Sequence, residues 1–129
     1  MKLIPSPNKQ KKVLSWMRAG SAILLLLSAC GPSPAEQHYK AGTNLLANNR
    51  LEEAITELSK ALELDPKLAS AYSNRGIAYA RKGEYEKAVA DYEQALSLDP
   101  KYAQALFNRG IAYLHQGEGD KALAQDKDK

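Results

Sequence analysis

The chain has 129 residues, of which 18 are Lys or Arg and 15 are Asp or Glu, for a formal net charge of +3. Five basic residues and no acidic residue precede Gly20, so the segment Cys30–Lys129 keeps 13 basic and 15 acidic residues. Its net charge of −2 argues against a nucleic-acid partner, because binding to nucleic acid requires a basic surface.

The first 29 residues have the pattern of a secretory signal peptide. Basic residues are followed by the short apolar run AGSAILLLLSA, which ends in small residues at the expected cleavage point. This run is shorter than the ~20 apolar residues that a membrane-spanning helix needs. We therefore predict a signal peptide over residues 1–29.

The four residues Leu27–Cys30 (LSAC) resemble a bacterial lipobox, in which the signal peptide is cut just before the cysteine. The resemblance implies a thioether-linked diacylglycerol on Cys30 and a fatty acyl group on the new amino terminus, with residues 30–34 as a lipidated tether. Gly31, where inner-membrane lipoproteins have aspartate, resembles the outer-membrane class and implies the periplasmic face of the outer membrane. The alternatives are an ordinary cleaved signal peptide and an uncleaved anchor.

The hexapeptide NRGIAY occurs twice, at Asn74–Tyr79 and Asn108–Tyr113, and the two copies are 34 residues apart. Alignment on this period divides the remaining chain into the units 35–68 and 69–102 and a partial unit 103–129. A fixed period of this length is typical of stacked repeats.

Each unit has the pattern of two helices. Ser33, Pro34 and Glu36 form a capping-box helix start, and Leu-Asp-Pro at 64–66 and 98–100 ends the second helix of each full unit. Residues that tolerate a left-handed backbone recur in the middle of the units, at Asn49, Gly83 and Gly117. No stretch shows the alternation of a strand, so the predicted fold class is all-α, with antiparallel helix pairs stacked along a line.

Small residues recur once per unit at two places: Gly42, Gly76 and Gly110 in the first helix, and Ala54, Ala88 and Ala122 in the second. With the proline that ends each full unit, this pattern resembles the tetratricopeptide repeat family. The resemblance implies a short solenoid of two full repeats and a partial third, with Gly76 packed against Ala88. Gly119 and Asp126 stand where the family has large apolar residues, so we expect the last helix to be short or frayed.

The family binds ligands in a concave groove lined by the first helix of each repeat. The resemblance implies that the groove-facing residues here are Tyr39, Thr43, Ser73, Asn74, Ile77, Arg81, Phe107, Asn108, Ile111 and Leu114. Some family members hold a peptide main chain with asparagines at the position of Asn74 and Asn108. The alternative is that each asparagine bonds a neighbouring helix. The family's clamp for carboxyl-terminal chaperone peptides is matched only at Asn74, so that partner class is disfavoured.

No feature of the sequence indicates catalysis, a metal or a cofactor. His38 and His115 lie in different units and have no cysteine or carboxylate at ligand spacing beside them. We therefore expect a non-enzymatic, membrane-anchored module of the bacterial envelope that binds a peptide or partner protein, as an assembly factor, a pilotin-like protein or an adaptor. The alternative is a self-associating building block, a homo-oligomer in which another copy completes the third repeat.

Overall fold

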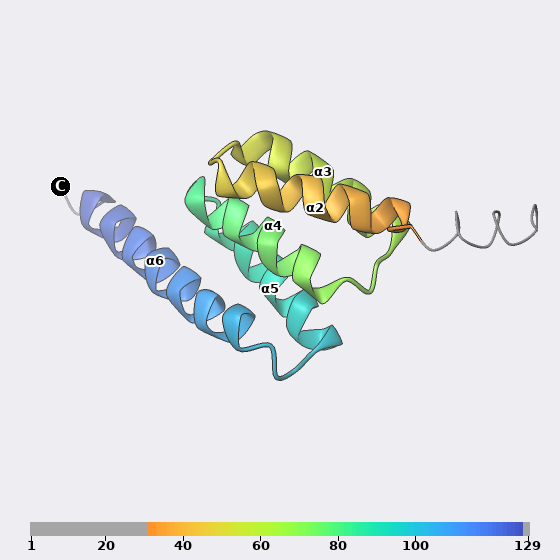
Figure 1. Ribbon diagram of the computed structural model, residues 1–129. Coiled ribbons are helices and arrows are strands. Elements are labelled where there is room, and N and C mark those ends of the chain that lie inside the picture. The colour runs from red at the N-terminus through yellow and green to blue at the C-terminus, as the bar shows by residue number, and fades with distance from the viewer. Residues whose placement is uncertain (1–30, 128–129) are drawn as a thin grey trace, which may run out of the picture. The chain divides into compact units, whose positions relative to one another are not determined.

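The computed structural model describes residues 31–127, and for residues 119 and 121–127 it describes the backbone alone. The predicted signal peptide and the predicted lipidation of Cys30 lie outside the described residues. The described part is helical throughout, with short connections and no strand, which confirms the all-α prediction (Figure 1). Its helices are α2 (Pro34–Ala47), α3 (Leu51–Leu64), α4 (Ala69–Arg81), α5 (Tyr85–Leu98) and α6 (Ala103–Lys127).

The helix boundaries follow the predicted caps and turns. Ser33 caps α2, because its side-chain oxygen accepts a hydrogen bond of 3.2 Å from the backbone N–H of Glu36. The turns between the paired helices contain Asn49 and Gly83, whose φ angles are 58° and 81°. Such angles are common for glycine and are tolerated by asparagine, which is why these two residues mark the middle of the first two repeats.

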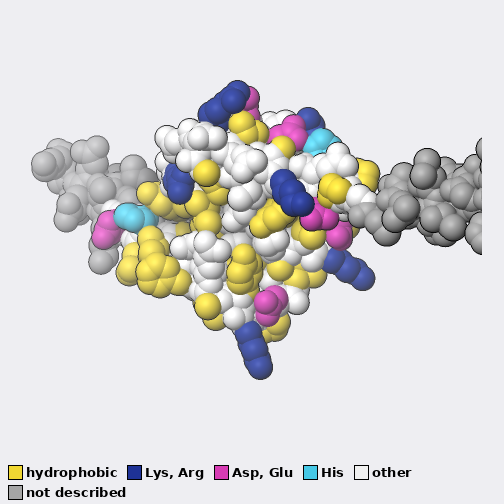
Figure 2. Space-filling model, viewed as in Figure 1, with side chains coloured by type: hydrophobic (Ala, Val, Ile, Leu, Met, Phe, Trp, Pro, Cys, Tyr) yellow, Lys and Arg dark blue, Asp and Glu magenta, His cyan; other side chains and the backbone are white. Residues whose placement is uncertain are grey.

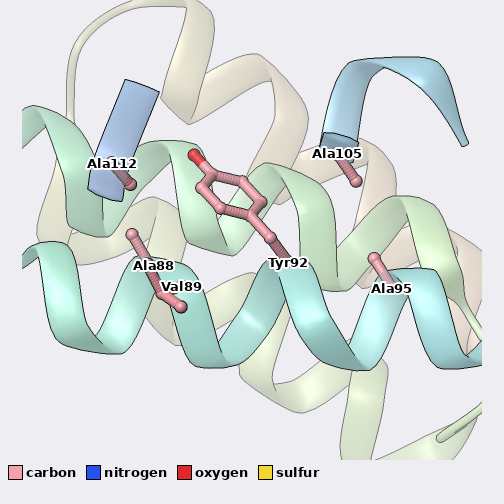
Figure 3. Packing of buried hydrophobic residues seen from close by; sticks show 6 residues of the cluster. All are labelled: Ala88, Val89, Tyr92, Ala95, Ala105 and Ala112. Atoms are coloured by element: carbon pink, nitrogen blue, oxygen red, sulfur yellow. The ribbon is translucent and has the colours of Figure 1, made fainter. Parts of the chain in front are cut away.

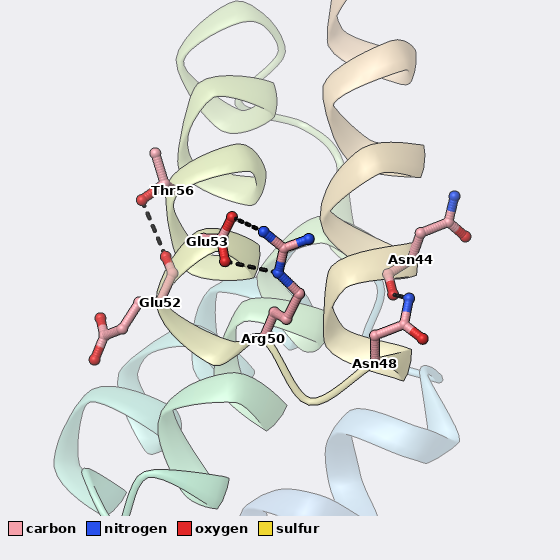
Figure 4. A network of polar contacts seen from close by, with 6 residues as sticks. All are labelled: Asn44, Asn48, Arg50, Glu52, Glu53 and Thr56. Atoms are coloured by element: carbon pink, nitrogen blue, oxygen red, sulfur yellow. Dashed lines mark hydrogen bonds and ion pairs between the residues drawn. The ribbon is translucent and has the colours of Figure 1, made fainter.

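The turn between α2 and α3 carries a local polar network (Figure 4). Asn48 donates a hydrogen bond of 2.9 Å to the carbonyl oxygen of Asn44 at the end of α2. Arg50 pairs with Glu53 in the first turn of α3, with a distance of 2.7 Å between Nε and Oε1. Acidic residues are favourable in the first turn of a helix, so this network supports both the end of α2 and the start of α3.

The core lies between the helices of each pair and between successive pairs. One face of α3, formed by Ala54, Leu58 and Ala61, is buried, and so is the equivalent face of α5, formed by Ala88, Tyr92 and Ala95. The ring of Tyr92 projects from α5 into a cluster that includes Ala105 and Ala112 of α6 (Figure 3). Alanines on both sides of one large side chain allow the helices to pack closely around it.

The glycine of each full repeat faces the large side chain of the partner helix. A Cβ atom added at Gly42 would lie 2.6 Å from Cγ of Leu58, and one added at Gly76 would lie 2.6 Å from Cε1 of Tyr92. The three atoms nearest to this position at Gly76 all belong to Tyr92, so the ring of Tyr92 lies closer to it than the predicted Ala88. The glycine is needed because the ring of Tyr92 occupies the space of a side chain.

The predicted turn at Gly117 was wrong. Residues 103–127 form the single helix α6, which runs through Gly117 without bending back on itself (Figure 1). The sequence gives the physical reason, because Gly119 and Asp126 replace the large apolar residues that anchor α3 and α5 to their partners. A returning helix would bury little apolar surface, and continuation of α6 keeps its backbone hydrogen bonds.

Candidate functional site

A pocket of about 380 Å³ lies between α4, α5 and α6. Its lining residues are Ile77, Ala80, Arg81, Tyr85, Tyr92, Gln104, Asn108, Ile111, Ala112 and His115. The pocket thus lies where the first helices of the second and third units approach each other. This is the place at which the sequence predicts a groove.

The structure brings four of the predicted groove residues together in this pocket: Ile77, Arg81, Asn108 and Ile111. It also adds Tyr85 and Tyr92, which sequence reasoning missed because they come from α5, the second helix of its repeat. Burial raises the pKa of Tyr92 to about 12, so its hydroxyl is neutral at physiological pH. The sequence signal for Tyr92 is Gly76 of α4, because a glycine at this position leaves room for a large ring from α5.

Asn74 bonds a neighbouring helix, as the alternative interpretation of the two asparagines predicts. Its side-chain nitrogen donates a hydrogen bond of 3.1 Å to the hydroxyl oxygen of Thr43, and that hydroxyl donates to the carbonyl oxygen of Tyr39 at 2.9 Å. Tyr39 packs against the cluster formed by Leu58, Leu62 and Ala71. The predicted groove residues of the first unit are therefore engaged in contacts between helices.

Asn108 differs from Asn74 although both belong to the same hexapeptide. The position one repeat after Thr43 is Ile77, whose side chain has no oxygen to accept a hydrogen bond from Asn108. Within the described residues the side chain of Asn108 makes no hydrogen bond, and it lines the pocket half-buried. Its amide can both donate to and accept from a ligand.

Arg81 of α4 and His115 of α6 hold equivalent repeat positions and both line the pocket. Arg81 donates a hydrogen bond of 3.0 Å to the carbonyl oxygen of Leu46 at the end of α2, which ties the first repeat to the second. His115 stacks on Tyr85 with ring centroids 5.0 Å apart and an interplanar angle of 13°. Both side chains are thus held in place by neighbouring helices.

Two further predicted groove residues, Phe107 and Leu114, form an exposed apolar strip along α6 together with Ile111. Phe107 is 70% exposed and Leu114 is 69% exposed. Figure 2 shows hydrophobic side chains gathered in the region of α6. Because isolated exposed apolar residues are common but strips are not, this surface is suited to contact with another molecule.

Ser73 was wrongly predicted to face the groove. It is fully buried, and its hydroxyl has no hydrogen-bond partner within the described residues. α4 is covered on more than one side, so the helical face assigned to the groove by the repeat pattern extends partly into the core. A ligand in the groove does not reach Ser73.

The described residues contain no group of three or more His, Cys, Asp or Glu side chains arranged to hold a metal ion.

His38 is bonded to Glu57, with 2.7 Å between Nδ1 and Oε2. The hydrogen bond from Lys60 and this bond from His38 lower the pKa of Glu57. None of the helices in the described part is sufficiently long and apolar to span a bilayer.

A family model described as TPR repeat matches residues 42–83 and 78–117, which together cover more than half of the chain. The chain belongs to the tetratricopeptide repeat (TPR) family. The matched ranges run from the middle of α2 to the first part of α6, so the TPR match ends where the structure departs from the repeat. The TPR fold is a scaffold for interactions between proteins.

Solved TPR structures resemble the chain over about seven tenths of its length. The first TPR of Spaghetti (RPAP3), bound to the HSP90 peptide SRMEEVD, has a TM-score of 0.65 and 25% identity and covers 71% of this chain and 73% of its own. The Sgt2 TPR domain from Aspergillus fumigatus has a TM-score of 0.63 and 31% identity, with coverage of 68% and 59%. MamA has a TM-score of 0.64 and 30% identity and covers 77% of this chain and 54% of its own. This chain thus spans little more than half of the Sgt2 and MamA chains.

Proposed function

We propose that the chain binds a peptide segment of a partner protein in the groove between α4 and α6. The single observation that carries this proposal is Asn108, whose half-buried amide has no hydrogen-bond partner within the described residues and lines a pocket of about 380 Å³. A side-chain amide can bond the main chain of a peptide without reading its sequence. The bound peptide in the similar first TPR of Spaghetti supports a peptide as the ligand.

The apolar strip of Phe107, Ile111 and Leu114 adds a chemical preference. These side chains continue from the pocket along α6 and offer apolar surface to the side chains of a ligand. Among the lining residues that the structure describes, Arg81 is the only Lys or Arg, and its side chain donates to the carbonyl oxygen of Leu46. The groove therefore favours an apolar peptide over the acidic peptide seen with the first TPR of Spaghetti.

The two asparagines provide a matched test of the groove. Peptides selected from a displayed random library against the full chain would be measured by fluorescence anisotropy. Asn108→Ala removes an amide that faces the ligand, and we expect binding about tenfold weaker, since a hydrogen bond contributes ~1 kcal/mol and leaves its partner unsatisfied when lost. Asn74→Ala is the control, because its amide is bonded to Thr43. Equal affinities for both variants and the unchanged chain would refute the groove.

The anchoring of the module rests on the sequence pattern at Cys30. Acylation there would hold the TPR module at the membrane of the bacterial envelope, with the periplasmic face of the outer membrane favoured by Gly31. Tethering raises the effective concentration of a partner in the same membrane, so a weak groove suffices. A labelled fatty acid should enter the unchanged protein but not Cys30→Ser. Normal processing and membrane association of the serine variant would contradict the anchor.

A further inference from the structure

α6 carries a second face, distinct from the groove, which repeats the face by which α4 holds α5. The residues of α4 on this face are Tyr72, Arg75, Gly76 and Tyr79, and those at the same spacing on α6 are Leu106, Arg109, Gly110 and Tyr113. We call the second set the end face. The repeated hexapeptide supplies three of its four residues.

On α4 this arrangement recognises an acidic residue and a large ring. Nε and Nη2 of Arg75 donate to the two carboxylate oxygens of Asp91, each at 2.7 Å. The next residue, Tyr92, lies against Gly76, where an added Cβ atom would be 2.6 Å from the ring. Ala88 and Ala95 are fully buried on either side of this pair. α5 therefore presents the pattern Ala-x-x-Asp-Tyr-x-x-Ala to α4.

On α6 the same positions are without such a helix. A Cβ atom added at Gly110 would meet nothing within 4 Å, and Arg109 forms no ion pair within the described residues. Leu106 is 44% exposed and Tyr113 is 47% exposed, although Tyr113 donates one hydrogen bond of 2.9 Å to Glu93 of α5. α6 continues to Lys127 as one helix, so its own described residues do not cover the end face.

We propose that the end face binds an amphipathic helix of a partner protein that carries the pattern Ala-x-x-Asp-Φ-x-x-Ala, where Φ is a large apolar or aromatic residue. The aspartate pairs with Arg109 through two parallel hydrogen bonds, as Asp91 does with Arg75. The large residue fills the space over Gly110. The alanines allow the partner helix to approach Leu106 and Tyr113.

Charge and shape both select this occupant over a generic apolar helix. A guanidinium beside apolar surface favours a carboxylate at one position of the bound helix, because burial of an unpaired charge is costly. A residue larger than alanine in place of either flanking alanine would hold the two helices apart. The site is also separate from the groove, since Asn108 and Ile111 line the pocket and the end-face residues do not.

The probe for this site is a labelled synthetic peptide with the sequence of Glu84–Leu98, EYEKAVADYEQALSL. Binding to the full chain is measured by fluorescence anisotropy, and the control peptide has Lys in place of Asp91. We expect the unchanged peptide to bind and the control peptide to bind at least tenfold more weakly. On the chain variant Arg109→Glu this order should reverse. A reversal of preference is a result that misfolding or nonspecific apolar contact does not produce.

Two further variants define the site. Gly110→Leu fills the space for the large residue and should weaken binding at least tenfold, with helicity unchanged by circular dichroism because the position is open. Asn108→Ala should leave binding of this peptide unaltered, which separates the end face from the groove. Absence of binding overturns the proposal. Binding that Gly110→Leu does not alter also overturns it, since the peptide would then displace the chain's own α5 and not occupy the end face.

Two other occupants would be recognised by their own results. Concentration-dependent dimerisation of the chain that Gly110→Leu abolishes would assign the end face to a second copy and overturn the partner helix. Binding of the peptide only after deletion of residues 118–129 would assign it to the chain's own following segment, with the same consequence.

Discussion

Gly76 and Gly110 occupy the same place in successive repeats and differ only in what lies opposite them. Replacement by alanine adds one Cβ atom in each case. It also reduces the conformational entropy of the unfolded chain equally at both positions, and this change stabilises a helix interior by about 1 kcal/mol. At Gly110 the new atom meets nothing within 4 Å, so the full gain should appear as higher stability. At Gly76 the atom would lie 2.6 Å from Cε1, 2.9 Å from Cδ1 and 3.1 Å from Cζ of Tyr92.

The ring of Tyr92 is only 1% exposed and packs in the cluster with Ala105 and Ala112, so a shift of the ring disturbs those contacts. Overpacking of this kind costs ~1–3 kcal/mol, and we expect Gly76→Ala to be less stable than Gly110→Ala by that amount. In a domain of this size the difference corresponds to a separation in Tm of at least ~4 °C. Urea and thermal unfolding followed by circular dichroism measure it. Equal stability of the two variants would show that Tyr92 does not pack on Gly76.

The remaining predictions concern buried polar groups. Because burial raises the pKa of Tyr92 from 10.0 to about 12, its neutral form contributes up to about 3 kcal/mol of stability that is present below pH 10 and lost as the pH rises to 12. Urea unfolding between pH 8 and pH 12 should show this loss in the unchanged chain and not in Tyr92→Phe; parallel curves would contradict it. The side chain of Asp91 is 7% exposed, so Arg75→Met should destabilise the fold by ~3–5 kcal/mol. The double variant Arg75→Met/Asp91→Leu should recover part of that loss in the same urea assay, and an unaltered single variant would refute the buried pair.

The helix pairs and their turns could be predicted because local chemistry determines them. Asn49 and Gly83 adopt the left-handed backbone that their residue types allow, and the prolines of the Leu-Asp-Pro triplets cannot continue a helix. The turn expected at Gly117 did not form, although glycine permits it. A glycine only allows a turn, and the return of the chain also needs apolar residues that can be buried afterwards.

The position of the groove could be predicted, but the contacts of its individual residues could not. These contacts differ because each depends on the residue that the neighbouring repeat places opposite. Asn74 and Asn108 are equivalent in the repeat, but one has Thr43 opposite it and the other has Ile77. A repeat pattern assigns the same role to equivalent positions. The actual contact depends on which residue of the adjacent unit lies opposite. Ser73 shows the same limit, because the pattern does not indicate how far the next helix pair covers α4.

The single bond from Arg81 to the carbonyl oxygen of Leu46 joins residues 35 positions apart in the chain. It couples the end of the first helix in one repeat to the end of the first helix in the next, so opening of the first pair removes a constraint on the second. Among the described residues α6 makes no hydrogen bond of this kind, since His115 replaces the arginine and stacks on Tyr85 of α5. Amide hydrogen exchange should therefore be slowest in the two coupled pairs and fastest in α6, with a gradient along the stack. Any ligand that contacts α6 would raise protection there first, and its measured affinity would include the cost of ordering that helix.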